Sequence, residues 1–427
     1  MPNTTNSKYK AEVWDVMQFL FAKFNDHQIH CVIRLDAKLD EERLRRAADL
    51  LIDAFPLIRS RFVEDSGTPY WEDAGFTAKS VVFLRESNHP DEEIQKVICS
   101  RNDEACGPQM CIYIIRGKTA DSLCVVINHM LCDGAGFKEL LYLLSFAYSQ
   151  LKKNPNYRLP RQNGSRSERQ ILHAFHMKSK VKILTQRYGL SRHDDSIVFG
   201  LEGNKNTPLI VTHTIPRERF LAAKGFAKHY GATVNDLLLA AYLRALHRVL
   251  PDRTAVIQCV LDLRKFLPHK KAAGPCNLTS DLVCDIGPDV GEKFSDTLKL
   301  VKHAMDKEKE QASCLHLIML LEVVFHILPY SLAKRAVLRE YHNPPLAMSN
   351  IGVIDSKRLS FDGTLVTKAY ITGSVKYCPL FQLALSTFRD EVTLSAAFHG
   401  TQADQEKISR FLKSIDDELP CELACRT

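Results

Sequence analysis

The sequence contains no run of about eighteen residues free of charged or polar side chains, which is the length that a membrane-spanning helix needs. Its first residues, MPNTTNSKYKAEVWD, lack the basic-then-apolar order of a signal peptide. The 13 cysteines have no regular spacing and predict reduced, mostly buried thiols rather than a disulfide framework. The last four residues, Ala-Cys-Arg-Thr, do not form a prenylation box. We therefore expect a soluble, cytoplasmic protein without a membrane span or a lipid anchor.

The short motifs of several enzyme classes are also missing. The chain has no G-x-S-x-G nucleophile elbow and no glycine-rich phosphate loop. His129, Cys132 and Asp133 lie close together, but no further His or Cys pair stands at a metal-binding spacing. We expect neither serine-hydrolase chemistry nor a bound metal.

The composition is that of a globular protein with an uneven charge. With 427 residues, 45% of them hydrophobic, the chain is long enough for two packed cores. The net charge is +7, but residues 152–192 carry eleven Lys or Arg against the single acid Glu168. Pro155, Pro160 and Asn163-Gly164-Ser165 add turn signals there. The predicted division is an N-terminal subdomain over 1–160, a basic linker over 161–200 and a C-terminal subdomain over 201–427.

The excess charge of this stretch, +10, allows two interpretations. A solvated surface is the ordinary one. The functional one is a docking face for the phosphates of a ligand or for an acidic partner protein. Aromatic side chains that would stack on bases are sparse there, so we expect no nucleic-acid partner.

Hydrophobic periodicity predicts strands and helices on both sides of the linker. Asp40 caps a helix whose apolar positions follow the 3.6-residue period, and Pro56 ends it. Arg389-Asp390 joins two strands as a hairpin. The predicted strands are 29–35, 81–84, 110–115, 123–127, 209–215, 255–263, 348–354, 366–375, 381–388 and 392–398, and the predicted helices 40–55, 137–151, 217–230, 234–250, 295–310, 315–341 and 403–415. The pattern favours an α/β chain with mixed sheets in two halves, each with its own sheet.

The segment VVINHMLCDGAGF, residues 125–137, runs from a predicted buried strand through a loop into a helix. A neutral imidazole at His129 can take a proton from a hydroxyl or an amine if its other ring nitrogen is held. Asp133 could hold that nitrogen, or it could point away from the ring and need a cation of its own. Gly134 leaves room for a substrate beside the base. The alternative is a core histidine next to a helix cap formed by Asp133.

Several segments carry a resemblance to a known superfamily. His129 and Asp133-Gly134 match the signature (H)HxxxD(G), although Asn128 stands where condensation domains usually have the first His. The other matching segments, in chain order, are LDEERLRRAADLLIDAFPLIRSRF (39–62), GATVNDLLLAAYLRAL (231–246), VLDLRKFLP (260–268) and SNIGVID (349–355). Together they resemble the chloramphenicol-acetyltransferase-like acyltransferases, which include condensation domains of nonribosomal peptide synthetases, alcohol acetyltransferases and wax-ester synthases.

This resemblance implies a V-shaped pseudodimer of two chloramphenicol-acetyltransferase-like subdomains, with the active centre in a tunnel between them. It implies that His129 is the general base in acyl transfer from a thioester to a hydroxyl or an amine. It also implies that Asp133 is structural and pairs with Arg264 of the Asp-Leu-Arg segment. An oxyanion needs donors as well, for which Asn277, Ser349 and Asn350 are candidates by position.

Departures from the superfamily pattern limit which kind of acyltransferase we expect. The DFGWG box of the plant BAHD enzymes is absent, since the corresponding region reads FRDEVTLSAAFHG. The length of the chain favours a standalone acyltransferase. We expect no bound cofactor, acyl-CoA as co-substrate, a small alcohol or amine as acceptor, and a monomer. The alternatives are a phosphopantetheinyl thioester on an acidic acyl carrier protein as donor, and a catalytically silent relative that serves as a binding or scaffold protein.

Overall fold

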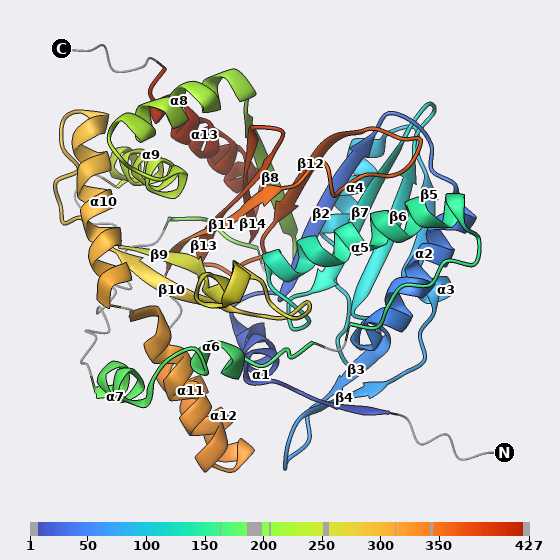
Figure 1. Ribbon diagram of the computed structural model, residues 1–427. Helices are drawn as coiled ribbons and strands as arrows, with labels where there is room; N and C mark the ends of the chain where they lie inside the picture. Colours follow the sequence, from blue (N-terminus) through green and yellow to red (C-terminus); the bar gives the residue numbers. More distant parts are fainter. Residues whose placement is uncertain are drawn as a thin grey trace.

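The computed structural model describes residues 7–162, 164–185, 199–204, 206–250, 256–311, 313–341 and 345–421. The chain forms two lobes that lie side by side (Figure 1). A five-stranded sheet forms the centre of one lobe and a six-stranded sheet the centre of the other, and a three-stranded sheet accompanies the first. The expected α/β class with mixed sheets is confirmed.

The five-stranded sheet has the order β12-β2-β7-β6-β5. Its strands are β2 (Gln28–Leu35), β5 (Val82–Glu86), β6 (Met110–Arg116), β7 (Asp121–Asn128) and β12 (Val366–Thr372). β7 is buried along its whole length, as its run of large apolar residues predicts. Helices α2 (Glu41–Ala54) and α5 (Gly134–Lys153) pack against each other on one face, and α4 (Pro90–Ile98) contacts β6 and β7. Asp40 caps α2, as expected, by accepting a 3.0 Å hydrogen bond from the backbone N–H of Arg43.

The six-stranded sheet has the order β10-β9-β11-β13-β14-β8. Its strands are β8 (Pro208–Ile215), β9 (Ile257–Asp262), β10 (Thr279–Cys284), β11 (Leu346–Ile354), β13 (Phe381–Phe388) and β14 (Glu391–His399). The helices of this lobe are α8 (Arg217–His229), α9 (Val234–Val249), α10 (Phe294–Gln311) and α13 (Gln402–Glu418). Arg389 and Asp390 both have positive φ, 50° and 62°, which fits the tight hairpin predicted between β13 and β14.

One strand crosses between the lobes. β12 follows β11 in sequence but pairs antiparallel with β2, from Val366 opposite Leu35 to Thr372 opposite His30. The expectation that each half supplies its own sheet is therefore wrong for this strand, because its register partner lies in the first forty residues. The subdomain boundaries remain a prediction, and residues 186–198 of the basic linker lie outside the described residues.

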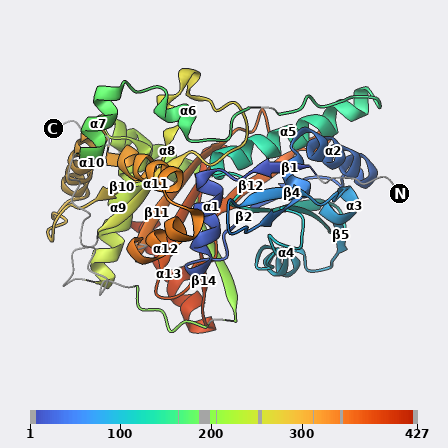
Figure 2. The same cartoon turned by 90° about the horizontal axis from the view of Figure 1, so that it is seen from below.

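Other elements depart from the predicted pattern in smaller ways. The helical stretch predicted over 315–341 is two helices, α11 (His316–Ile327) and α12 (Tyr330–Glu340), because Pro329 lacks the N–H that would continue α11. The hydrophobic pattern did not predict α4 and β10, nor the elements β1 (Lys8–Lys10), β3 (Ser60–Val63), β4 (Tyr70–Asp73), α1 (Val13–Leu20), α3 (Ala78–Val81), α6 (Arg169–Leu172), α7 (Met177–Thr185) and the 3₁₀ turns η1 (Phe21–Lys23), η2 (Pro56–Arg59), η3 (Leu263–Phe266), η4 (Pro268–Lys270) and η5 (Ser313–Leu315). Seen from below, α11 lies beside α1 (Figure 2).

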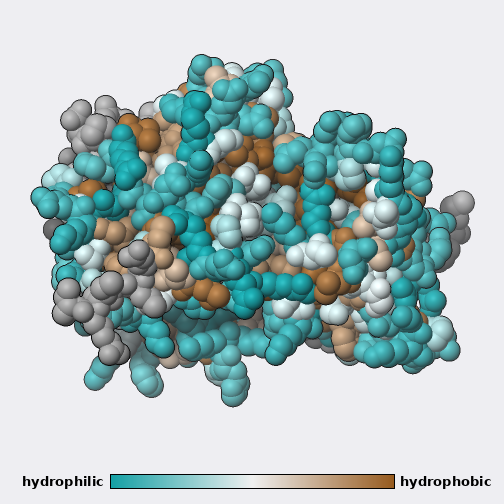
Figure 3. Space-filling view, turned by 90° about the horizontal axis from the view of Figure 1, so that it is seen from above, coloured by the Kyte–Doolittle hydropathy of each residue, from teal (hydrophilic) through white to brown (hydrophobic). Residues whose placement is uncertain are grey.

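The surface seen from above is mostly hydrophilic, and hydrophobic residues show through it in separate patches (Figure 3). Scattered apolar residues of this kind are ordinary for a protein surface. Among the described residues, no single helix is long and apolar enough to cross a membrane. The segments Phe294–Glu310 and Ser313–Ile327 satisfy the length and composition only as a pair, bent by 50°.

Candidate active site between the two lobes

The loop from His129 to Asp133 joins the end of β7 to the start of α5. Asn128 holds the beginning of this loop: its Oδ1 accepts from the N–H of Met130 at 2.9 Å, and its Nδ2 donates to Oε1 of Gln109 at 2.9 Å. The N–H of His129 donates to the carbonyl of His27 at 2.8 Å. The Asn that replaces the first His of the signature therefore fixes the turn and lies buried, away from the solvent.

Asp133 does not hold the imidazole but connects the two lobes. Its Oδ1 accepts from the N–H of Gly136 at 2.9 Å and so caps α5. Its Oδ2 accepts from the N–H of Leu278 at 2.7 Å and from Nη1 of Arg264 at 2.8 Å. The pairing expected between Asp133 and Arg264 is thus present. Arg264 also donates through Nη2 to the carbonyl of Cys276 at 2.8 Å.

This carboxylate remains ionised although it is almost fully buried. Burial alone would raise the pKa of Asp133, but the charge and hydrogen bond of Arg264, together with the N–H groups of Gly136 and Leu278, hold that pKa below its ordinary value. The same pair raises the pKa of Arg264 against the effect of burial. Asp133 and Arg264 form a buried, fully hydrogen-bonded ion pair that fixes the loop to the second lobe.

His129 lies on the wall of a cavity between the lobes. The cavity has a volume of about 130 Å³, and its walls include His129 and Gly134 from one lobe and Val260, Thr279 and Ser349 from the other. Nδ1 of His129 is buried and has no hydrogen-bond partner among the described residues. Burial lowers the pKa of His129 below its ordinary value. The imidazole is therefore neutral at pH 7, which is the state that can accept a proton.

Gly134 permits a close approach of the two lobes. A Cβ at this position would lie 2.9 Å from Cγ2 of Ile351 on β11, so a side chain there would force the start of α5 away from β11. Gly134 also borders the cavity, where the sequence analysis expected room for a substrate. The missing side chain thus serves the packing of α5 on β11 as well as the cavity wall.

The three oxyanion candidates lie in different surroundings. Ser349 borders the cavity together with His129. Asn277 uses its Nδ2 to donate to the carbonyls of His129 and Met130, at 2.9 and 3.1 Å, so it positions the loop from behind. Asn350 uses its Oδ1 to accept from the N–H of Gly352 at 3.0 Å and is not part of the cavity wall. Ser349 is the candidate whose position allows contact with a reacting group.

Arg166 holds the same loop from the other side and was not expected from the sequence. Its guanidinium forms two hydrogen bonds to the carboxylate of Asp15 on α1, at 2.8 and 2.9 Å. Its Nη2 also donates to the carbonyls of Met130 and Leu131, at 3.3 and 3.0 Å. Trp71 donates to Asp15 through Nε1 at 2.9 Å. In the sequence Arg166 is one of many basic residues of the predicted linker, and nothing there distinguishes it from a solvated one.

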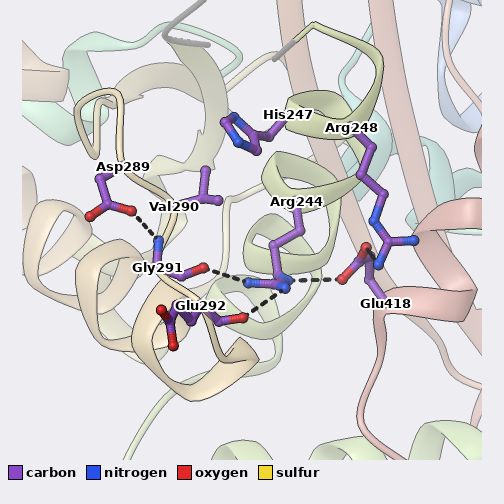
Figure 4. A pocket seen from close by; sticks show the side chains of 8 residues that line it. All are labelled: Arg244, His247, Arg248, Asp289, Val290, Gly291, Glu292 and Glu418. Carbon is purple, nitrogen blue, oxygen red and sulfur yellow. Dashed lines mark hydrogen bonds and ion pairs between the residues drawn. The ribbon is translucent and has the colours of Figure 1, made fainter. Parts of the chain in front are cut away.

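A second hollow, of about 290 Å³, lies on the C-terminal lobe among α9, α13 and the loop before α10 (Figure 4). Its charged groups already have protein partners. Arg244 donates to Oε2 of Glu418 at 2.8 Å and to the carbonyls of Gly291 and Glu292, and Arg248 forms an ion pair with the same Glu418. Arg244, Arg248 and Glu418 thus form a charged cluster on the wall of this hollow. No group of three or more metal-ligating side chains is found within the described ranges.

No protein-family model matches this sequence, and no curated protein matches it in sequence. Solved structures match its fold over almost the whole chain. The first condensation domain of the calcium-dependent antibiotic synthetase, bound to a substrate analogue, has a TM-score of 0.70 at 13% identity and covers 98% of each chain. Trichothecene 15-O-acetyltransferase from Fusarium sporotrichioides has a TM-score of 0.67 at 13% identity and covers 97% of this chain and 95% of its own.

Two further matches broaden the range of chemistry found on this fold. Polyketide synthase associated protein 5 from Mycobacterium tuberculosis has a TM-score of 0.66 at 14% identity, and covers 97% of this chain and 98% of its own. An epimerization domain of tyrocidine synthetase B has a TM-score of 0.67 at 15% identity, with coverages of 97% and 96%. The chain thus shares its fold, over almost its whole length, with these condensation, epimerization and acetyltransferase structures.

Proposed function

We propose that this protein is an acyltransferase that moves an acyl group from a thioester to a hydroxyl or an amine, with His129 as general base. The observation that carries the proposal is a neutral imidazole on the wall of a cavity between the lobes, on a loop whose two ends are fixed by buried polar contacts. A fold that supports condensation, epimerization and O-acetyl transfer does not identify the reaction. We therefore infer the reaction from the residues of the site and not from the fold.

The reaction follows from the groups present. Nδ1 of His129 is buried, so Nε2 is the nitrogen through which the ring meets an acceptor in the cavity. It takes the proton of the acceptor hydroxyl or amine while the acceptor oxygen or nitrogen forms a bond to the thioester carbon. The carbonyl oxygen becomes an oxyanion, for which the Ser349 hydroxyl is the donor candidate on the cavity wall. The C–S bond then breaks, and the leaving thiolate takes the proton from His129.

Acyl-CoA is the donor we favour, with a phosphopantetheinyl thioester on an acidic carrier protein as the second candidate. Exposed lysines in the predicted basic linker would attract either the phosphates of CoA or an acidic carrier protein. Lys178 and Lys182 are exposed on α7, whereas Arg166 is buried on Asp15 and Arg169 pairs with Glu322. The remaining candidate is a catalytically silent scaffold protein. The complete set of His129, Asp133 and Arg264 argues against it, since a scaffold needs no neutral imidazole at a cavity.

The test is the release of free thiol from acyl-CoA donors of increasing chain length, in the presence of pooled alcohols and amines. We expect His129→Ala to lower the rate by about 100-fold or more, the usual scale for loss of a general base. His326→Ala, which changes an exposed histidine of α11, is the matched control and should leave the rate unchanged. Because burial lowers the pKa of His129 from 6.5, the parent kcat/KM should stay level as the pH falls to about 6.5 and decline only below it.

Unchanged thiol release in His129→Ala would show that His129 is not the base. Absence of thiol release with every acyl-CoA, but product formation with an acylated carrier protein, would select the carrier-bound donor. Absence of both would support the silent scaffold.

A further inference from the structure

Lys376 brings a cation to the cavity that the proposed reaction does not use. It follows β12, and its backbone is fixed to β14 through hydrogen bonds with Ala397 and His399, at 2.9 and 3.0 Å. Its side chain forms part of the cavity wall, together with His129 and with Asp281 of β10. The position of the side chain is therefore defined by the sheet of the C-terminal lobe and not by a loose surface loop.

The ammonium group of Lys376 forms neither a hydrogen bond nor a salt bridge with the residues that the structure describes. Of the two nearby carboxylates, Asp26 is buried and already accepts from the N–H groups of Gln28 and Val375, at 3.2 and 2.9 Å. Asp281 stands on the cavity wall itself. A cation with free donors at a cavity is a binding group for an anion.

The charge of Lys376 is present at neutral pH. Burial lowers the pKa of Lys376 to about 8, so most of the population is protonated at pH 7. Burial raises the pKa of Asp281 to about 6, so this carboxylate is mostly ionised at the same pH. Besides Asp133, whose charge is paired with Arg264, the cavity thus presents one positive and one negative group to a bound molecule.

We propose that Lys376 binds a carboxylate of the acceptor that occupies this cavity, so that the protein selects an acceptor with an ionised carboxylate close to the reacting atom. This inference rests on the proposed function, because it assigns the cavity to that reaction. Lys376 and His129 line the same cavity, so an anion bound by Lys376 lies close to the proposed base. The anion therefore belongs to the part of the substrate that reacts.

Binding of such a carboxylate also acts on the base. The charge of Lys376 is one of the causes that lower the pKa of His129. A carboxylate that pairs with Lys376 offsets this charge, and the imidazole becomes a better proton acceptor. Asp281 acts in the opposite sense to Lys376, because its negative charge repels a bound carboxylate and weakens the binding.

The first test uses two small alkylating reagents that differ in charge, iodoacetate and iodoacetamide, and measures by peptide mass spectrometry how fast each labels His129. In the parent, the ratio of the iodoacetate rate to the iodoacetamide rate should exceed that in Lys376→Met by about tenfold, since only the anion is attracted by the ammonium. Lys376→Arg should keep most of the ratio, and Asp281→Asn should increase it. Lys96→Met, which removes an exposed lysine of α4, is the control for the overall charge.

Equal ratios in the parent and in Lys376→Met would overturn the inference. Failure of both reagents to label His129 would show that small molecules do not reach the ring, and would overturn the proposed function as well. Circular dichroism of each variant checks that the substitution leaves the fold intact.

The second test compares acceptors supplied in pairs, as the free acid and as the primary amide, in the thiol-release reaction. A preference of about tenfold for the acid, lost in Lys376→Met with a raised KM, supports the inference. Turnover that does not distinguish acid from amide, and that is the same in both proteins, would overturn the inference while leaving the proposed acyl transfer in place. The His129→Ala variant tests the proposed function separately, because it should lose turnover with both the acid and the amide.

Discussion

His129 and Asp133 belong to the same short motif but have different roles. His129 faces the cavity and is neutral, whereas Asp133 is ionised and is fully occupied by Arg264, Gly136 and Leu278. The spacing of the motif places them on opposite sides of a tight turn, so the carboxylate cannot orient the imidazole. The orientation of the ring depends instead on its backbone, which His27 and Asn277 hold at the N–H and the carbonyl of His129.

Arg264→Ala should lower the free energy of unfolding by about 3–5 kcal/mol, because it leaves the Asp133 carboxylate buried without its cation. Denaturant unfolding at pH 7 measures this loss. Since the pKa of Asp133 is held below 3.8 in the folded protein, the pair contributes fully at pH 7 and its contribution is lost only as the pH falls into the acid range.

Arg358→Ala is the matched control, because Arg358 forms a largely exposed ion pair with Glu139. It should cost less than about 1 kcal/mol. If the two variants lose the same stability, the assignment of a structural role to the Asp133 and Arg264 pair is wrong.

At the residue scale, the sequence indicated His129 as the candidate base but not the residues that hold its loop. His129 and Asp133 stand in a recognisable motif, and Arg264 could be paired with Asp133 only through the resemblance to known acyltransferases. The positions of Asn277 and Arg166 depend on side chains that approach the loop from more than thirty residues away in sequence. No local pattern records such contacts, since an isolated Asn or Arg is equally suited to a solvated surface.

The loop between β7 and α5 is an element without regular structure that is held from three directions. Asn128 holds it at the end of the strand, Asn277 from the C-terminal lobe, and Arg166 from the segment after α5. Each uses donors or acceptors on the backbone of residues 129–131. A loop held through its backbone keeps its conformation largely independently of the side chains it presents, which suits a site that must place one imidazole.

Arg166→Gln should loosen this loop, because it removes the donors to Met130 and Leu131 and one partner of Asp15. We expect amide hydrogen exchange in the peptide that contains residues 129–133 to become roughly tenfold faster, and kcat to fall more than KM rises. Arg169→Gln, which changes an exposed neighbour paired with Glu322, should leave this peptide unaffected. Equal exchange of the loop in both variants would contradict a positioning role for Arg166.

The long elements follow from the hydrophobic pattern, while the short ones do not. The apolar periodicity of α2, α5, α9 and α13 places these helices within a few residues of their observed bounds. β1, β3 and β4 have three or four residues each and form a small sheet through pairing, which no window of that length can indicate. Pro329 marks the break between α11 and α12 in the sequence, although the predicted helix over 315–341 runs through it.

At the scale of the whole molecule, the two lobes are in contact beyond the candidate active site as well. β12 covers the edge of β2 with an antiparallel ladder that extends along almost all of β2. The sequence predicted β12 as a strand, but pairing between residues more than 300 positions apart leaves no local signal, so its sheet could not be predicted. Asp133 with Arg264 forms a second connection between the lobes.

The shared strand makes the N-terminal lobe dependent on the C-terminal part of the chain. Expressed alone, residues 1–160 would expose β2 as an unpaired edge whose residues are nearly all buried in the intact protein. An apolar edge of this kind pairs with other chains. We therefore expect the 1–160 fragment to aggregate, and co-expression with residues 201–427 to restore a soluble complex in size-exclusion chromatography.

A variant of the full chain separates the effect of the shared strand from that of chain length. Lys368→Pro removes an N–H of β12 that faces β2, opposite Arg34, because the N–H of Ile371, three residues further on, points the other way to Ser386. If β12 holds the lobes together, this variant should lose stability and expose the β2 amides to hydrogen exchange. A soluble, monomeric 1–160 fragment with a protected β2 would instead show that the lobe folds without β12 and that the boundary predicted near residue 160 is a true domain limit.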